Sequence, residues 1–160
     1  MFDIFGEMGS AEEINRTADG LKAEGDTENI LKLAEENGID AGFAQMYIDG
    51  DIEELCDIAT AAFGKIDIEA AQLECVEIMD DWKEYIKTAC LTDDELAVAV
   101  RRKEKSLKGC IGAWLKYSFE NAQDVDREIL KASGVRAAQV KLGIPGMGRA
   151  KQIIRDYYKG

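Results

Sequence analysis

The sequence predicts an all-α protein, a single-domain bundle of seven or eight helices. Proline occurs once, at Pro145, and the alternation of apolar and polar residues that marks strands is nearly absent. Serine, threonine and aspartate recur just before apolar stripes of helical spacing, where they can cap a helix N-terminus. The one segment that could be extended is residues 135–142. A chain of 160 residues is long enough to bury a sizeable core.

Three short helices are predicted in the first fifty residues, each bounded by capping signals. Their predicted N-caps are Ser10, in an S-x-x-E capping box with Glu13, then Asp26 or Thr27, and then Asp40. The first helix is expected to end at Gly25. The second is expected to close at Asn37 and Gly38 with a left-handed turn.

Residues 31–48 have the spacing of a helix-turn-helix, with Gly38 in the turn. Their second helix has no lysine or arginine, and aspartates flank it at Asp40 and Asp49. A helix that reads DNA lies against phosphates and needs cations. The charges therefore favour a plain helical hairpin, of a kind suited to binding protein.

Two Asp-Ile-Glu triplets, at Asp51 and Asp67, are each predicted to begin a helix, since an aspartate cap and an acidic first turn suit the helix dipole. The first of these helices is expected to end near Gly64. The second is expected to run to about Cys90. Trp82 lies at the centre of its apolar stripe, which predicts a core residue.

A further capping box, T-x-x-E at residues 92–95, begins a helical pattern that continues to about residue 115. Gly109 and Gly112 lie within this pattern, and each costs roughly 1 kcal/mol against alanine inside a helix. Either the helix is interrupted near residues 101–108, or these glycines let another element approach closely.

A shorter helix at about residues 125–133 and a closing helix from near Pro145 complete the predicted bundle. Residues 142–151, LGIPGMGRAK, place three glycines before the closing helix. Exposed N–H groups there could hold a phosphate, with Arg149 and Lys151 adding charge. The alternative is a flexible turn in which the proline starts the helix.

Charge is divided unevenly along the chain, whose formal net charge is −12. Residues 1–100 hold 26 acidic and 6 basic side chains, whereas residues 101–160 hold 6 acidic and 14 basic ones. We interpret these as an acidic helical part and a basic helical part, packed as one domain. Such asymmetry indicates a highly charged partner.

The boundary between the two parts is the basic run RRKEKSLKG, residues 101–109. It is either a solvated or intramolecularly paired surface, or a patch that binds anions. The residues predicted to contact a partner or nucleic acid are Arg101, Arg102, Lys103, Lys105, Lys108, Arg149 and Lys151. Exposed ion pairs contribute only about 0–1 kcal/mol each, so we expect the loss of two of these cations to leave stability nearly unchanged.

Several function classes are excluded by residue types that the sequence lacks. There is no histidine, which removes Ser-His and Cys-His catalysis. No C-x-x-C pair joins the cysteines, so a zinc site is not expected, and they are predicted to be buried thiols rather than disulfides or redox groups: Cys56, Cys75, Cys90 and Cys110. A calcium loop from Asp49 fails, because its sixth and twelfth positions are Glu54 and Thr60. We expect no enzyme activity, no metal and no cofactor.

The sequence gives no sign of export or membrane insertion. Its start, MFDIFGEMGSAEE, lacks the basic and apolar regions of a signal peptide. Its longest aliphatic run, residues 96–100, is far short of the roughly 20 residues that cross a bilayer. We therefore expect a cytoplasmic protein with no membrane partner.

KSLKGCIGAWLKYSFENAQ (105–123) with VDREIL (125–130) resembles the SLKGC-helix segment of PcfK-like proteins, which are small proteins of Gram-positive conjugative and other mobile elements. The closing GIPGMGRAKQIIRDYYKG also looks like the tails of uncharacterised proteins of such elements. The resemblance covers about a third of the chain. It marks Lys105, Lys108, Gly109 and Cys110 as positions of a shared segment, and it brings no catalytic motif.

The group that this segment resembles includes anti-CRISPR proteins that inhibit Cas9. The resemblance therefore implies an anti-CRISPR protein that binds a Cas9-type RNA-guided nuclease stoichiometrically, without turnover. A Cas9-type effector holds its nucleic acid in a positively charged channel. The acidic part would occupy that channel as a nucleic-acid mimic, or the basic part would touch guide RNA or displaced DNA. The alternative is a nucleic-acid-binding accessory protein of conjugation or replication that uses residues 101–160.

Overall fold

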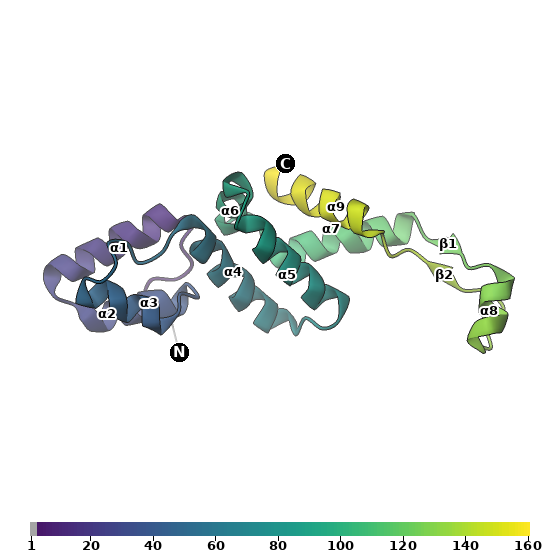
Figure 1. Cartoon of the computed structure of the whole chain (residues 1–160), viewed down its shortest axis with the longest axis horizontal. Helices are drawn as coiled ribbons and strands as arrows, with labels where there is room; N and C mark the ends of the chain where they lie inside the picture. The colour runs from purple at the N-terminus through teal and green to yellow at the C-terminus, as the bar shows by residue number, and fades with distance from the viewer. Residues whose placement is uncertain (1–2) are drawn as a thin grey trace. The chain divides into compact units, whose positions relative to one another are not determined.

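The structure is a computed structural model that describes residues 3–160, and it confirms the all-α prediction (Figure 1). Across these residues it has nine helices and one two-stranded sheet. The count exceeds the expected seven or eight because the pattern from residue 92 to 115 belongs to two helices. The chain divides into two compact units. The first comprises the chain up to Lys108 together with Lys159, and the second comprises residues 109–158 and Gly160.

The first three helices begin and end where the sequence predicts. They are α1 (Ala11–Glu24), α2 (Thr27–Glu36) and α3 (Ala41–Asp49). Their N-caps are Ser10, Asp26 and Asp40, whose side-chain oxygens accept from the backbone N–H groups of Glu13, Asn29 and Gly42 at 3.0, 3.2 and 2.7 Å. Apolar faces of the three helices, led by Ile14, Ile30 and Leu33, form the core of this part.

The boundaries predicted for the two helices at the Asp-Ile-Glu triplets are wrong. The helix α4 (Ile58–Leu73) is capped by Asp57, and it runs through Gly64 and Asp67 without a break. The helical segment is interrupted instead at residues 74–77, where Glu74 and Glu77 have φ values of 49° and 53°. After this turn, α5 (Ile78–Cys90) begins.

Gly64 is a point of close approach rather than a helix stop. A Cβ atom at Gly64 would lie 2.9 Å from the backbone carbonyl carbon of Gly38 and closer still to the carbonyl oxygen of Asn37. Gly38 itself has a φ of 71°, in the turn between α2 and α3. The helix α4 therefore meets this turn backbone against backbone, which only glycine permits.

We predict opposite effects on stability for two glycine-to-alanine changes in helices of the first unit. Gly64→Ala should lower the free energy of unfolding by about 1–3 kcal/mol, because the new methyl group overpacks a backbone contact. Gly20→Ala in α1 should raise it by up to about 1 kcal/mol, since a Cβ there meets no atom within 4 Å and alanine favours the helix. Urea denaturation followed by circular dichroism tests both, and a stabilised Gly64→Ala would contradict the close approach.

The helical pattern of residues 92–115 is interrupted near residues 101–108, which confirms the first of the two alternatives for this segment. The helix α6 (Asp94–Arg101) ends six residues before α7 (Leu107–Glu120) begins. Its N-cap is Asp93 rather than Thr92, and the Asp93 carboxylate accepts from the backbone N–H of Leu96 at 3.0 Å. A Cβ at Gly112 meets nothing within 4 Å, so that glycine does not serve a close approach. Within the first unit, α4 packs against both α5 and α6.

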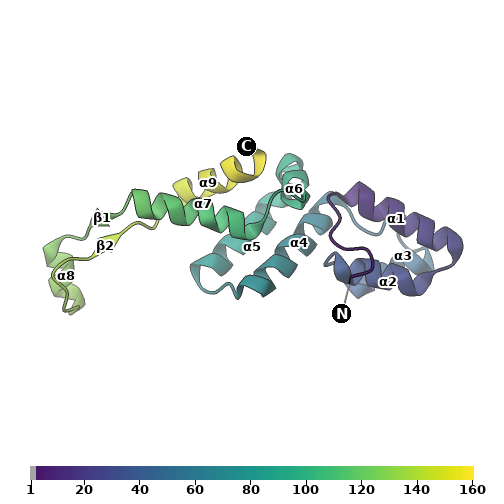
Figure 2. The ribbon, with the colours of Figure 1, turned by 180° about the vertical axis from the view of Figure 1, so that it is seen from behind.

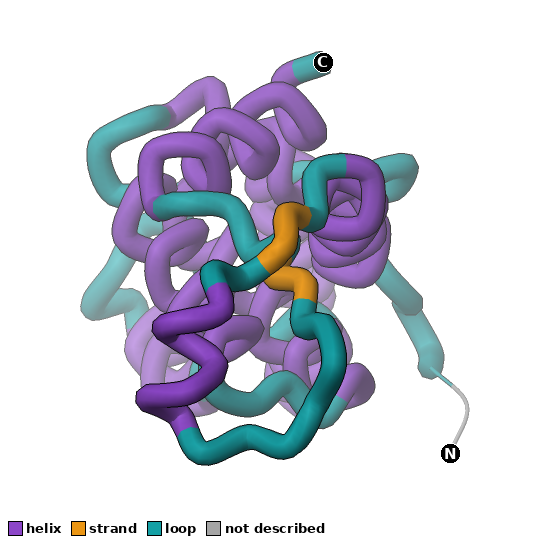
Figure 3. The backbone as a smooth tube through the Cα atoms, turned by 90° about the vertical axis from the view of Figure 1, so that its right-hand side faces the viewer, coloured by secondary structure: helices purple, strands orange, loops and turns teal. Residues whose placement is uncertain are grey.

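The second unit contains most of α7, a small antiparallel sheet and two more helices. Its elements after α7 are β1 (Gln123–Asp124), α8 (Arg127–Ser133), β2 (Lys141–Leu142) and α9 (Met147–Lys159). The extended segment expected at residues 135–142 is reduced to β2, which pairs with β1, a strand that the sequence analysis missed. α7 and α9 run side by side in Figures 1 and 2, and the sheet with α8 forms the part of the unit facing the viewer in Figure 3.

Candidate interaction surfaces

Arg101, predicted to face a partner, is a core residue, and its prediction as a contact residue is wrong. Its side chain is 2% exposed at the end of α6. Its guanidinium donates to the carbonyl oxygens of Met8, Asn37 and Ala61 at 2.8, 3.1 and 2.9 Å, and also to the side-chain oxygen of Asn37. Arg101 thus joins the N-terminal segment, the end of α2 and the start of α4.

The charge of Arg101 is held in the interior by these oxygens. Burial lowers the pKa of Arg101 from its usual value, while the nearby carboxylates of Glu7 and Glu69 oppose that shift. An arginine keeps its proton in proteins. The four hydrogen bonds therefore compensate a full positive charge in the interior.

Lys65, a second buried cation, fixes the turn that carries the basic run. Its side chain is 3% exposed on α4. Its ammonium donates to the carbonyl oxygen of Lys105 at 2.7 Å and to that of Arg102, and it lies 2.9 Å from a carboxylate oxygen of Glu7. The turn is therefore attached to α4 through the main-chain oxygens of Arg102 and Lys105.

Three predicted contact residues meet at one cavity of about 240 Å³ in the first unit. They are Lys103 and Lys108, which are exposed, and Lys105, which is half-buried. Glu7 and Glu69 line the same cavity, so its charge is mixed. An anion bound here would meet both signs of charge, which makes this cavity a weak anion site. Of the other two cations of the run, Arg101 is buried, and Arg102 is exposed but does not line this cavity.

Glu69 binds the N-terminus of α7, where the basic run enters that helix. Its carboxylate accepts from the backbone N–H of Leu107 at 2.7 Å, at the first residue of α7. Burial raises the pKa of Glu69 above its usual value, and this hydrogen bond partly opposes the shift. The N-terminus of α7 is thus already occupied by a carboxylate of the protein.

The remaining two predicted residues, Arg149 and Lys151, lie in the second unit on α9. Both are exposed. The Arg149 guanidinium carbon lies 5.8 Å from the centre of the Tyr117 ring, within reach of a cation–π contact. The seven predicted residues therefore do not form one patch within a single unit.

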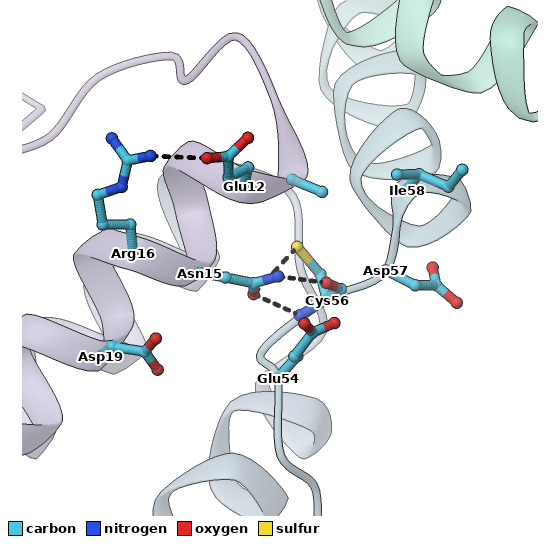
Figure 4. Close-up of a pocket in the computed structure, with 9 residues that line it drawn as sticks. Glu12, Asn15, Arg16, Asp19, Glu54, Cys56, Asp57 and Ile58 are labelled. Atoms are coloured by element: carbon cyan, nitrogen blue, oxygen red, sulfur yellow. Dashed lines mark hydrogen bonds and ion pairs between the residues drawn. The ribbon is translucent and has the colours of Figure 1, made fainter.

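An acidic hollow of about 560 Å³ lies between α1 and the loop before α4 (Figure 4). Asn15 holds that loop: its side-chain nitrogen donates to the carbonyl oxygen of Cys56 at 2.8 Å, and its oxygen accepts from the Cys56 N–H at 3.1 Å. The carboxylates that line the hollow are Glu12, Asp19, Glu54 and Asp57, and Arg16 pairs with Glu12 at 2.7 Å. Burial raises the pKa of the Cys56 thiol to about 12, which favours the protonated thiol at neutral pH.

The surface of the first unit carries a more negative net charge than its residue counts give, because two of its cations are buried. Up to Lys108 the chain has 27 acidic and 11 basic side chains. Among the described residues, the charged side chains that are buried are Lys65 and Arg101, both cations. The carboxylates are at least partly exposed, so the interior removes positive charge alone from the surface.

Sequence reasoning missed the interior role of these two cations, although a helical signal was present. Lys65 stands among Ala61, Ala62 and Ile66 on the buried face of α4. Arg101 follows Ala97 by four residues and so shares the buried face of α6. A single cation inside an apolar stripe indicates an internal hydrogen-bonding role, and for Arg101 that signal was hidden by the basic residues that follow it.

Two further findings concern the part of the chain that the structure describes. Within residues 3–160, no three side chains of the metal-ligating types His, Cys, Asp and Glu converge on a common point. None of the helices there combines the length and apolar character needed to cross a bilayer. Comparison of the chain with protein-family models, with curated proteins and with solved structures finds no match.

Proposed function

We propose that this protein is an anti-CRISPR protein of a mobile genetic element, which binds a Cas9-type RNA-guided nuclease and inhibits it without turnover. Its acidic first unit takes the place of nucleic acid in the positively charged channel of the effector complex. The protein acts in the cytoplasm, where such a complex works. The resemblance of residues 105–123 to PcfK-like proteins supplies the class of partner.

One observation favours the acidic surface of the first unit over the basic run as the contact with the nuclease. The first unit exposes its carboxylates and buries Lys65 and Arg101. A surface dense in carboxylates is complementary to a cationic channel and raises the association rate with it. The basic run has lost Arg101 to the core, and its lysines share their cavity with glutamates. The acidic surface is therefore the better candidate for contact.

The proposal is tested by titrating the protein into a purified Cas9–guide complex. DNA cleavage should be lost at a near-equimolar ratio, and the protein should co-purify with the complex. Binding should weaken as salt increases, because opposite charges are screened. Full cleavage at a tenfold excess of the protein would contradict the proposal.

Two matched pairs of substitutions separate the acidic from the basic surface. Glu53→Gln with Glu54→Gln removes two exposed carboxylates, and Lys103→Gln with Lys108→Gln removes two exposed cations. We expect the first pair to weaken binding by about tenfold and to reduce its salt dependence, at an unchanged melting temperature. The second pair should bind as tightly as the unaltered protein or more tightly. The reverse outcome would assign the contact to the basic run.

A second candidate is a nucleic-acid-binding accessory protein of conjugation or replication, and Phe119 favours it. This side chain is 87% exposed on α7, and the exposed Lys116 lies one turn before it. An exposed aromatic ring beside a cation suits stacking on the bases of single-stranded nucleic acid. Under this function the protein binds a single-stranded oligonucleotide without any nuclease, and Phe119→Ala weakens that binding. Absence of binding at low salt would exclude it.

A further inference from the structure

The residues before α1 are held against the end of α2 by one carboxylate. Glu36 accepts from three successive backbone N–H groups, those of Ile4, Phe5 and Gly6, at 2.7, 2.7 and 3.0 Å. Successive N–H groups that converge on one anion form a nest, a backbone concavity that binds negative charge. Gly6 has a φ of 69°, which glycine adopts without strain. We call residues 3–6 the strap; it belongs to the dark purple segment that passes α2 in Figure 2.

The other contacts of the strap hold it less firmly. The Ile4 side chain is 56% exposed, and the Phe5 ring is only partly buried against the core. The Gly6 carbonyl oxygen accepts from the Asn37 side chain at 3.3 Å, a long hydrogen bond. The end of a chain stays ordered only where something ties it down. For the strap, the short bonds to Glu36 have that role.

The two residues that follow the strap are attached in a different way. Glu7 pairs with the buried Lys65 at 2.9 Å. The Met8 N–H donates to the side-chain oxygen of Asn37 at 3.0 Å, and its carbonyl oxygen accepts from Arg101 at 2.8 Å. Met8 is therefore part of the buried network around Arg101, whereas the strap depends on a half-buried carboxylate. Segments that differ in this way open separately, because local opening begins where few contacts are buried.

The attachment of the strap depends on charge. Burial opposes the ionisation of Glu36, but the three N–H groups and the charge of Lys32 outweigh it, so the pKa of Glu36 lies below the usual 4.5. The stabilisation is therefore fully present above pH 4.5 and is lost as pH falls through the lowered pKa.

Two cavities of about 370 and 180 Å³ border the strap, and Asp3 and Glu36 line both of them. The other charged side chains of these cavities come from the segment before α1, from α2, α4 and α6: Glu7, Lys32, Glu35, Lys65, Glu69 and Arg101. Since Asp3 belongs to the strap, the strap supplies a wall that the two cavities share.

We propose that the strap is a lid that the charge of Glu36 holds closed, and that it opens about Gly6 while Glu7 and Met8 stay attached. Opening removes the wall that the two cavities share. It also uncovers the core surface against which Phe5 packs and frees the Glu36 carboxylate at its edge. The inference goes beyond the nuclease function and does not depend on it.

The test is amide hydrogen exchange of the full chain at pH 7, resolved by residue with nuclear magnetic resonance. Glu36→Gln keeps the shape of the side chain but removes its charge, and hydrogen bonds to a charged acceptor are roughly twice as strong as neutral ones. We expect exchange at Ile4, Phe5 and Gly6 to accelerate tenfold or more. The matched control is Glu35→Gln, which neutralises the adjacent exposed carboxylate of the larger cavity and should leave these three rates unchanged.

The Met8 amide separates a lid from a general loosening. It should exchange within about twofold of its original rate in both variants, as should the amides of α2. Unchanged exchange of the strap in Glu36→Gln would overturn the proposal. Equal acceleration at Met8 or throughout α2 would also overturn it, because Glu36 would then support the whole unit rather than a lid.

A pH titration identifies the group that holds the strap. The amide proton shifts of Ile4, Phe5 and Gly6 should change together in the unaltered chain and in Glu35→Gln, with a midpoint below pH 4.5. This shared change should disappear in Glu36→Gln. Its persistence there would assign the attachment to another carboxyl group, such as that of Asp3, and would contradict the proposal. Circular dichroism shows whether the chain stays folded over this range, and the exchange result at pH 7 decides alone if it does not.

Discussion

Arg101→Ala is expected to lower the free energy of unfolding by about 3–5 kcal/mol, the usual cost of removing one partner from a buried charged network. The substitution leaves the carbonyl oxygens of Met8, Asn37 and Ala61 without their donor in a buried site. Each unsatisfied buried group costs about 1–3 kcal/mol. Urea denaturation followed by circular dichroism measures the loss.

The adjacent residue supplies the matched control. Arg102 has the same side chain one position along, but it is exposed. Arg102→Ala should therefore change the free energy of unfolding by no more than about 0.5 kcal/mol. Arg101→Lys keeps the charge but loses the planar fork that serves several acceptors at once, so it should still be clearly destabilised. An Arg101→Ala protein as stable as Arg102→Ala would show that the network is not needed.

This contrast corrects the expectation that cations of the basic run can be lost without effect on stability. That expectation rests on exposed ion pairs, and Arg101 makes none. It stays a prediction for Lys103 and Lys108, whose side chains are exposed. A variant that reverses the charge of Arg101 would report on folding rather than on partner binding.

Helix boundaries were predictable where they are set by local chemistry. Ser10, Asp26 and Asp40 cap their helices through their own side chains, and the glycine at position 25 takes a left-handed φ of 74° to end α1. Each of these signals acts within a few residues of the chain. A sequence contains such information directly.

Boundaries that depend on contacts between distant segments were not predictable. Asp67 resembles a cap, yet it lies in the interior of α4, where the buried residues Ala62, Ile66 and Ala70 continue across the expected break. Gly64 resembles a stop, yet it admits the backbone of the α2–α3 turn. The sequence alone does not say which apolar face is buried across an apparent cap, or which glycine meets another backbone.

The sign of charge of each candidate surface was predictable from the sequence, but the residues that form the surface were not. Counting residues located the acidic first hundred residues and the basic run correctly, since charge is additive along a chain. The burial of Arg101 depends on acceptors that lie 40 to 93 residues away. The grouping of Lys103, Lys105 and Lys108 at one cavity likewise depends on Lys65 holding the turn. These arrangements are tertiary, and a local pattern does not contain them.

Trp82→Ala is expected to lower the free energy of unfolding by about 3–5 kcal/mol, the usual cost of truncating a buried large aromatic side chain. The apolar stripe predicted Trp82 as a core residue, and the structure confirms it, with the side chain 4% exposed. It shares the buried face of α5 with Ile86 and Cys90, and α5 packs against α4 and α6. Truncation therefore leaves a cavity where helices of the first unit meet.

The size of this effect separates packing from a binding role for the ring. Leu91, just after α5, is 62% exposed, so Leu91→Ala should cost less than about 1 kcal/mol in the same measurement. Trp82→Phe keeps an aromatic ring in place and should cost less than the alanine change, because a smaller cavity remains.

Unfolding is followed by far-ultraviolet circular dichroism, since the substitution removes one of two fluorescent tryptophans. A loss below about 1 kcal/mol for Trp82→Ala would mean that the ring does not support the core, and Trp82 would then become a candidate contact for a partner.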